Sequence, residues 1–342
     1  MLRLVFMGSD PIALPALDWL APSTGSGQAG EGGSLAQVVG VFTQPDRATG
    51  RGQKVRANQI KLWAEARGLP VFQPAKVGAA EREQLAALQP DLTLVMAYGH
   101  LLRQEFIATP RLGTLNLHTS ILPAYRGASP IQTAIACGET ETGVTLMQMV
   151  LKLDAGPMAG EERVPVAPLD TAVEVDAKLG RACVPLLARC LPAIAAGRQV
   201  FTPQDEAAVT FCRRHDKSDG VLDFQAPAAL LAGRINGLMP WPGCTVVMAG
   251  QPVKLGLADA SNISDDSAAG AWPGAVLGAD DAGLLVATGQ GVLRLRKLQR
   301  PGGRMLPAGE FLRGFPVSAG ALLRSAPMPP LVAREPFPRL KG

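Results

Sequence analysis

Asn116 and His118 have side chains of the kinds that can donate hydrogen bonds to a reacting group and move a proton. They lie two residues apart in an apolar run that predicts a strand, so they should project from the same face of that strand. A turn over 120–127, containing Pro123 and Gly127, follows at once. We therefore expect an amide and an imidazole at the carboxyl end of a strand, where open α/β sheets bind ligands.

A carboxylate follows at the next predicted strand end. Asp154 lies in a loop with glycine and proline, directly after the strand-like run 143–150. The three side chains could meet at one sheet edge. No Ser or Cys in this stretch has the context of a nucleophile elbow, which argues against a covalent intermediate. Each residue taken alone is more often a turn former or a satisfied polar group, and spacing alone leaves that alternative open.

Alternating strand and helix patterns must position these residues, and the alternation is typical of a doubly wound parallel sheet. The expected strands are 2–7, 37–43, 70–72, 92–97, 143–150 and 158–166. The expected helices are 13–20, 57–67, 79–88 and a long helix from a capping box at Thr171 to about Ala196. The run 92–97 is almost wholly apolar and should be a central strand covered on both faces.

The second half of the chain has a different pattern. Short strand-like runs at 245–248, 253–257, 274–277, 283–287 and 291–298 are separated by glycines and aspartates, and a helix is expected over 227–238. Such runs suggest a small barrel. We predict a catalytic domain over 1–198, a polar linker over 199–209, a barrel over 210–320 and a basic, proline-rich tail over 321–342.

Composition places the chain among packed globular proteins, with 342 residues and 47% hydrophobic residues. No apolar run approaches the roughly 20 residues of a spanning helix, and strand-like residues begin at Leu2, so we expect no membrane segment or signal peptide. The 5 cysteines lack CxxC spacing, which suggests neither a disulfide framework nor a zinc site. A reducing cytoplasm fits, and no metal is expected.

Basic residues are concentrated in two segments, although the net charge of +4 is too small to indicate a nucleic-acid partner by itself. Arg51 lies between Gly50 and Gly52 in a polar loop at the carboxyl edge of the predicted sheet. The second segment lies on and beside the last barrel strand and contains Arg294, Arg296, Lys297, Arg300 and Arg304. Solvated surface is the simple interpretation of both, and contact with a phosphate backbone is the alternative.

The motifs around the candidate site resemble those of the folate-dependent formyltransferases. The resemblance rests on Asn-x-His at 116–118, the turn 120–127, the run 141–149 and Leu-Asp-x-Gly-Pro at 153–157, and it extends over nearly the whole chain. It implies a Rossmann-like catalytic domain followed by an OB-like β-barrel. It also implies transfer of a formyl group from 10-formyltetrahydrofolate to the α-amine of methionyl-initiator tRNA, with no obligate protein partner evident.

The resemblance also implies roles for individual residues. Asn116, His118 and Asp154 match the catalytic residues of the family. The folate-binding positions are Met96, Ala97, Tyr98, Gly99, Ser120, Ile121, Leu122 and Pro123. The tRNA-binding positions are Arg47, Arg51, Lys54, Arg294, Arg296, Lys297, Arg300 and Arg304. Arg51 matches an arginine that enters the acceptor end of the tRNA.

Two rival functions stay open at this point. One is formylation of a small amine, or hydrolysis of formyltetrahydrofolate, by the same fold, and the other is RNA binding without catalysis. The sequence also departs from the family pattern at Thr119 and Lys152, where glycine is usual, and at Gly8-Ser9-Asp10. These departures concern the shape of the loops, whereas all three chemical residues are kept.

Overall fold

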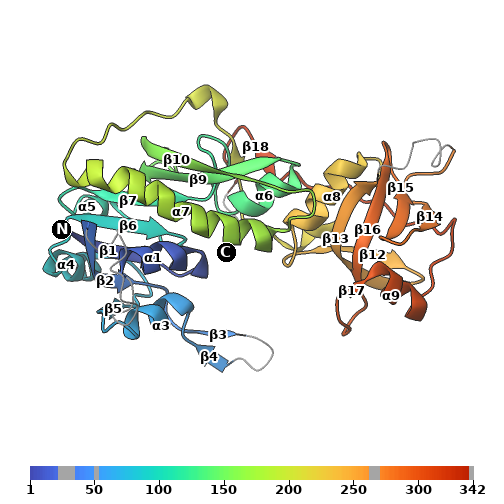
Figure 1. Ribbon diagram of the computed structural model, residues 1–342, viewed down its shortest axis with the longest axis horizontal. Coiled ribbons are helices and arrows are strands. Elements are labelled where there is room, and N and C mark those ends of the chain that lie inside the picture. Colours follow the sequence, from blue (N-terminus) through green and yellow to red (C-terminus); the bar gives the residue numbers. More distant parts are fainter. Residues whose placement is uncertain (22–34, 50–53, 262–269, 339–342) are drawn as a thin grey trace. The chain divides into compact units, whose positions relative to one another are not determined.

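The structure is a computed structural model that describes residues 1–21, 35–49, 54–261 and 270–338 (Figure 1). The chain divides into two compact units, and each is made of several stretches. The first unit contains 1–126, 143–164 and 177–209. The second contains 127–142, 165–176 and 210–342.

The first unit is built on a seven-stranded sheet in the order β10-β9-β7-β6-β1-β2-β5. The strands β5, β2, β1, β6 and β7 are parallel, and β9 is antiparallel to β7. Their bounds are β1 Leu2–Gly8, β2 Ala36–Phe42, β5 Val71–Phe72, β6 Leu92–Met96, β7 Thr114–His118, β9 Glu141–Gln148 and β10 Met158–Pro165. The order places β6 between β1 and β7, so the apolar run is a central strand, as predicted.

Helices cover both faces of this sheet. They are α1 Leu14–Leu20, α3 Gln59–Glu65, α4 Ala79–Ala87, α5 Gln104–Ile107 and α7 Ala172–Ala195. On one face Val5 and Met7 share a core cluster with Leu85 of α4. On the other face the thiol of Cys183 in α7 contacts the sulfur of Met96 in β6. Coverage of both faces explains why these strands are continuously apolar, and it confirms the predicted doubly wound fold.

The second unit is built on an antiparallel sheet, consistent with the expected OB-like barrel. Its strands are β12 Cys244–Met248, β13 Gln251–Ser261, β14 Val276–Ala279, β15 Leu284–Ala287, β16 Val292–Gln299 and β17 Leu306–Pro307. Its helices are α6 Pro130–Ala136, α8 Ala228–Gly237 and α9 Ala308–Gly314. The core includes Leu231 and Ile235 of α8 with Leu255 of β13 and Leu295 of β16.

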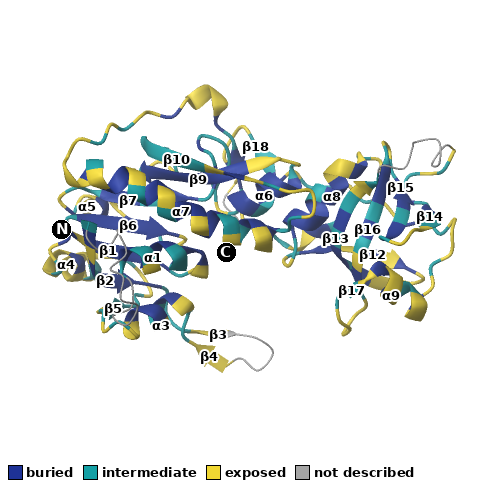
Figure 2. Ribbon diagram, viewed as in Figure 1, coloured by how far each residue is buried: buried dark blue, intermediate teal, exposed yellow. Residues whose placement is uncertain are grey.

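Several segments that sequence patterns describe as irregular have defined structure. The polar loop after β2 forms a hairpin of β3 Arg47–Thr49 and β4 Lys54–Arg56, whose described side chains are exposed (Figure 2). In the expected tail, β18 Val332–Ala333 pairs with β11 Phe211–Cys212. In the expected linker, Thr202 pairs with Met158 through two backbone hydrogen bonds. The three predicted boundaries, after residues 198, 209 and 320, stay a prediction.

Candidate active site

The carboxyl end of β7 brings two of the predicted catalytic residues close together. Asn116 and His118 lie two residues apart on the same face of β7. Asn116 is half-buried and His118 is buried. The Nδ1 atom of His118 lies 3.9 Å from a carboxylate oxygen of Asp154, in the loop between β9 and β10. The structure therefore places His118 and Asp154 together at the predicted sheet edge, with Asn116 one strand repeat away.

The other ring nitrogen of His118 fixes the tautomer. Nε2 lies 3.1 Å from the backbone carbonyl oxygen of Tyr125. A carbonyl can only accept, so Nε2 must carry the hydrogen. In the neutral ring Nδ1 is then without a proton, and only the charged ring presents one toward Asp154.

Side-chain hydrogen bonds hold the turn that carries Tyr125. The Ser120 hydroxyl donates to the carbonyl of Ala124 at 2.7 Å. The Thr145 hydroxyl of β9 donates to the carbonyl of Ser120 at 2.7 Å and accepts from the amide of Leu122 at 3.1 Å. Since Thr145 is also the β9 partner of His118, the same pair of strands positions the imidazole and its turn.

The loop with Asp154 has an unusual backbone. Asp154 has φ 47°, in the left-handed region that few non-glycine residues adopt. Two residues later Gly156 lies so close to β9 that an added Cβ would be 1.7 Å from the carbonyl oxygen of Gln148. The side chains of Leu151, Lys152 and Leu153 are exposed. The loop is thus fixed at its carboxylate end and open to solvent at its start.

Two residues that the sequence analysis did not select lie behind this loop. Gln204, from the expected linker, is buried and donates from Nε2 to the carbonyl oxygens of Asp154 and Gly156, each at 2.8 Å. Its Oε1 accepts from Nε and Nη2 of Arg126, at 3.0 and 2.8 Å. Arg126 lies within the turn 120–127 on which the family resemblance rests, but it had no predicted role. No sequence signal marked Gln204, because a glutamine in a polar stretch resembles any solvated residue.

The positions assigned to folate form two groups around β6 and the turn. Met96 and Tyr98 are buried, whereas Ala97 and Gly99 are exposed with φ 48° and 77°. Burial raises the pKa of Tyr98, and its hydroxyl has no hydrogen-bond partner among the described residues. At this edge exposed backbone is therefore what a ligand can contact, while Ser120 and Leu122 are buried and Ile121 and Pro123 are half-buried.

The residues assigned to tRNA binding in the first unit differ in what the structure describes of them. Arg47 is exposed and donates to the side chain of Gln44 at 2.7 Å, and Lys54 is exposed across the hairpin. Arg51 lies outside the described residues. Their roles stay predictions.

Ion pairs engage part of the second basic segment. Arg296 in β16 donates through two nitrogens to the carboxylate of Asp259 in β13, at 2.9 and 2.8 Å. Arg294 pairs with Asp259 at 3.4 Å and with Asp280 at 2.8 Å. Lys297 is exposed, as are Arg300 and Arg304. A phosphate would have to compete with two carboxylates for the first two arginines.

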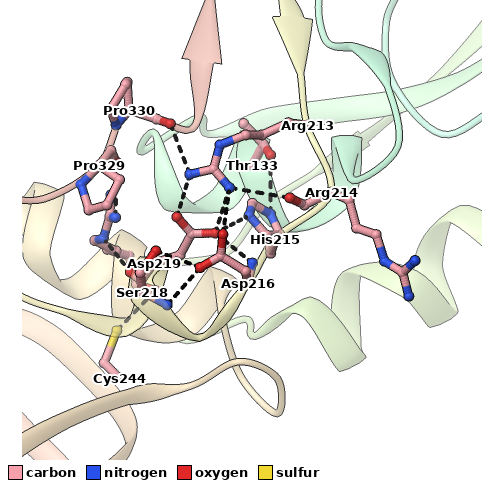
Figure 3. A network of polar contacts seen from close by, with 11 residues as sticks. Thr133, Arg213, Arg214, His215, Asp216, Ser218, Asp219, Cys244, Pro329 and Pro330 are labelled. Carbon is pink, nitrogen blue, oxygen red and sulfur yellow. Dashed lines mark hydrogen bonds and ion pairs between the residues drawn. The ribbon is translucent and has the colours of Figure 1, made fainter. Parts of the chain in front are cut away.

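A buried polar cluster ties the start of the second unit to its later segments (Figure 3). Asp219 is fully buried and accepts from two nitrogens of Arg213. Nδ1 of His215 lies 3.4 Å from Asp219, and its Nε2 lies 3.3 Å from the hydroxyl of Thr133. Burial lowers the pKa of His215, against the opposing attraction of Asp219. Arg234 donates to the carbonyl oxygens of Asp219 and Pro329, so the cluster holds the expected tail in place.

Two kinds of feature are absent from the described part of the chain. In these ranges no group of three or more His, Cys, Asp or Glu side chains has an arrangement that could hold a metal ion. No described helix combines the length and apolar character of a membrane span.

Comparison with known proteins agrees with this geometry. Residues 23–191 match the formyl transferase family, and residues 214–316 match the C-terminal domain of formyl transferases. A methionyl-tRNA formyltransferase of Bordetella bronchiseptica is 42% identical over 92% of this chain and 99% of its own length. Another, from Aromatoleum aromaticum, is 40% identical over 85% of this chain and 90% of its own.

Solved structures share the fold at lower identity. A crystal structure of HypX from Aquifex aeolicus in complex with tetrahydrofolic acid has a TM-score of 0.57 at 17% identity, over 91% of this chain and 47% of that one. An N-formyltransferase from Helicobacter canadensis, in complex with folinic acid and dTDP-3-aminofucose, has a TM-score of 0.61 at 14% identity, over 86% of this chain and 99% of that one. Together with relatives that are at least 40% identical over most of the chain, the two matched ranges show that the protein belongs to the formyl transferase family.

Proposed function

We propose that the protein transfers the formyl group of 10-formyltetrahydrofolate to the α-amine of methionine on initiator tRNA, in the cytoplasm. One observation carries the proposal. The imidazole of His118 is held between a carbonyl and the carboxylate of Asp154 at the carboxyl end of β7, in a chain that is 42% identical to a methionyl-tRNA formyltransferase over 92% of its length.

The chemistry defines what the site must do. The amine nitrogen of the methionyl group forms a bond to the formyl carbon, and the bond from that carbon to the folate nitrogen breaks. The attacking nitrogen loses a proton and the folate nitrogen gains one. Between these events the formyl oxygen carries negative charge, and fixed hydrogen-bond donors at that position lower the barrier.

The residues of the site match these tasks. Asn116 supplies an amide donor, and we assign the formyl oxygen to it and to His118. Since Nε2–H of His118 is engaged by Tyr125, the proton available for transfer or donation is the one on Nδ1 of the charged ring. Asp154 is the ion-pair partner of that charged ring. His118 and Asp154 together can therefore hold the proton that leaves the amine until the folate nitrogen takes it.

Substrate binding is assigned to the surrounding surfaces. The exposed backbone at Ala97 and Gly99 is suited to hydrogen bonds with the edge of a pterin, and the turn 120–123 lies next to His118. The tRNA would be held by the loop with Arg51 and by the basic segment of β16, whose exposed member in the strand is Lys297.

Direct measurement of the product tests the proposal. The purified chain is incubated with 10-formyltetrahydrofolate and one acceptor at a time: initiator Met-tRNA, elongator Met-tRNA, free methionine or an amino sugar nucleotide. We expect a mass increase of one formyl group on initiator Met-tRNA, and much slower reaction with the other acceptors. Formylation of the amino sugar nucleotide in preference to Met-tRNA, or release of formate without an acceptor, would replace the proposal by one of its rivals.

A further inference from the structure

We propose that Gln204, acting with Arg126, is a positioning residue. It sets the orientation of the catalytic imidazole through the two loops that contact the ring. The inference rests on the proposed function and concerns the same site. The two groups that contact the ring of His118 lie on separate loops, namely the carbonyl of Tyr125 and the carboxylate of Asp154. The side chain of Gln204 joins both loops.

The amide of Gln204 is fully used. Its Nε2 has two hydrogens, and they go to the carbonyl oxygens of Asp154 and Gly156, each at 2.8 Å. Its Oε1 accepts from two nitrogens of Arg126. Arg126 directly follows Tyr125 in the chain. One side chain thus links the backbone of the Asp154 loop to the side chain of the residue that follows Tyr125, through four hydrogen bonds.

The burial of Arg126 makes this arrangement demanding. Its guanidinium has 0% exposure, and Nη1 has no hydrogen-bond partner among the described residues. A buried charge that loses a partner is strongly destabilising. The Oε1 of Gln204 and the carboxylate of Glu206 are the acceptors that fix its position. Arg126 therefore holds Gln204 in a single orientation, with its amide directed at the Asp154 loop.

Backbone strain shows why the loops need this support. Asp154 has φ 47° and Tyr125 has φ 61°, which cost a non-glycine residue free energy unless the surroundings hold it there. The carbonyl of Tyr125 and the carboxylate of Asp154 both face the imidazole of His118. Without the hydrogen bonds from Gln204 the loop of Asp154 can relax, and its carboxylate then moves away from Nδ1 of His118.

The network has a surface end that can be changed separately. Glu206 accepts from Arg126 at 2.9 Å and from Lys152 at 2.7 Å, and these contacts, that with Lys152 first, hold the pKa of Glu206 below its usual value. Its side chain is 59% exposed, and none of these bonds touches the backbone of Asp154. Replacement of Glu206 therefore tests the surface ion pairs while the bonds from Gln204 to the carbonyl oxygens of Asp154 and Gly156 stay in place.

The decisive variant is Gln204→Glu. The carboxylate still accepts from Arg126, but it puts an oxygen where Nε2 donated, opposite the carbonyls of Asp154 and Gly156. We expect kcat for Met-tRNA formylation to fall by roughly tenfold to a hundredfold, the scale of a displacement of about 1 Å, while KM for both substrates changes less than about twofold. Gln204→Met, which adds no charge, serves in its place if that variant does not fold.

Two matched variants separate positioning from general loss of stability. Glu206→Gln keeps an oxygen that can accept from Arg126 and leaves the four bonds of Gln204, so its kcat should fall far less than that of the Gln204 variant. Val209→Ala removes buried volume from the same segment without touching the network, and it should lower the thermal midpoint with little change of kcat. A loss of kcat in Val209→Ala equal to that in the Gln204 variant, at a similar thermal midpoint, would reduce Gln204 to a structural residue.

A spectroscopic measurement reports on the imidazole itself. The chain has 3 histidines, so ¹⁵N-histidine spectra can be assigned with His100→Gln and His215→Gln. We expect the Nε2–H form of His118 in the parent protein, and a mixture with the Nδ1–H form in the Gln204 variant. An unchanged His118 signal together with normal kcat would overturn the inference. Failure of the parent protein to formylate Met-tRNA would count against the proposed function, whereas the His118 signal would still decide whether Gln204 positions the ring.

Discussion

The carboxylate of Asp154 lies 3.9 Å from Nδ1 of His118, which is longer than a direct hydrogen bond. An ion pair at this distance depends on charge more than on hydrogen-bond geometry. The backbone of Asp154 is in a strained conformation, so the carboxylate is held at this separation by its loop and not by the ring. In the proposed reaction, this carboxylate would stabilise a charge that appears on the imidazole.

Asp154→Asn tests this relationship. The amide keeps the size of the side chain but cannot pair with a charged ring, so we expect kcat to fall on the order of a hundredfold. Asp205→Asn, an exchange at an exposed turn that leaves the site unchanged, should have normal kcat. The measurement is kcat across pH. A profile for Asp154→Asn that overlays the parent profile at equal height would mean that Asp154 only shapes the turn.

Asn116→Ala and His118→Ala test the assigned oxyanion donors. Each should lower kcat by about a hundredfold or more, the scale for loss of one donor, while the Kd of tetrahydrofolate changes little. The reason is that both side chains lie on the same face of β7, at its carboxyl end. Circular dichroism should show an intact fold. Near-normal turnover in either folded variant would remove that residue from the catalytic assignment.

Lys297→Ala and Arg294→Ala distinguish exposed cations from paired ones. Lys297 should be the stronger phosphate contact, because Arg294 is already bound to Asp259 and Asp280. We expect Lys297→Ala to weaken tRNA binding modestly and to reduce the slope of log K against log salt by about one, with kcat unchanged. Arg294→Ala should change the slope less. Equal slopes for the two variants would show that tRNA displaces the aspartates.

Arg51→Ala is expected to act differently. The sequence predicts a cation between two glycines in a loop at the catalytic edge, which should place the aminoacyl end for attack. Its loss should therefore lower kcat as well as affinity, by up to about a hundredfold. The check is kcat at saturating tRNA, measured at several salt concentrations beside Lys297→Ala. A change in affinity alone, with the same salt slope, would make Arg51 one more phosphate contact.

The lowered pKa of His215 predicts how the stability of the fold depends on pH. Burial lowers the pKa of His215 in the fold below its ordinary value of 6.5, so the stability it contributes is present above pH 6.5 and is lost as the pH falls. Arg213, Arg234 and Asp219 are the charged groups that face it, with Thr133 as a polar neighbour.

The comparison is made in a His100→Gln background, because burial also lowers the pKa of His100. In that background we expect His215→Gln to lose less of its thermal midpoint than the parent between pH 7.5 and 5.5. The same pH dependence with and without His215 would exclude it as the titrating group.

Asn116 and His118 could be chosen as candidates because they lie two residues apart at the end of one strand, and their catalytic roles stay a prediction. The strand before Asp154, β9, is antiparallel to β7, so the order of the strands does not by itself explain why Asp154 lies beside His118. By contrast, Asn116 and His118 share one face of β7 by strand periodicity, and the parallel order of β1, β6 and β7 brings the carboxyl ends of these strands to one edge. The double coverage of β6 was likewise visible in its continuous apolar run. These features follow from short-range pattern and sheet geometry.

Gln204 and the fastened tail could not be predicted, because their partners are backbone atoms far away in sequence. A carbonyl that accepts from Gln204 leaves no mark on the identity of Asp154 or Gly156. The pairing of β11 with β18 involves two residues on each strand, too few for a detectable alternation. Arg294 and Arg296 were counted as available charge, since a sequence does not show that Asp259 lies beside them on the neighbouring strand.

The loop of Asp154 should tolerate substitution at its exposed start but not at Gly156. Any side chain at this position would collide with the backbone of β9, whereas Leu151, Lys152 and Leu153 face solvent. Random mutagenesis followed by selection for formylation should therefore recover many amino acids at 151–153 and essentially glycine alone at 156. Lys152 then stands at a position where a substitution costs little, because its side chain faces solvent and pairs with Glu206.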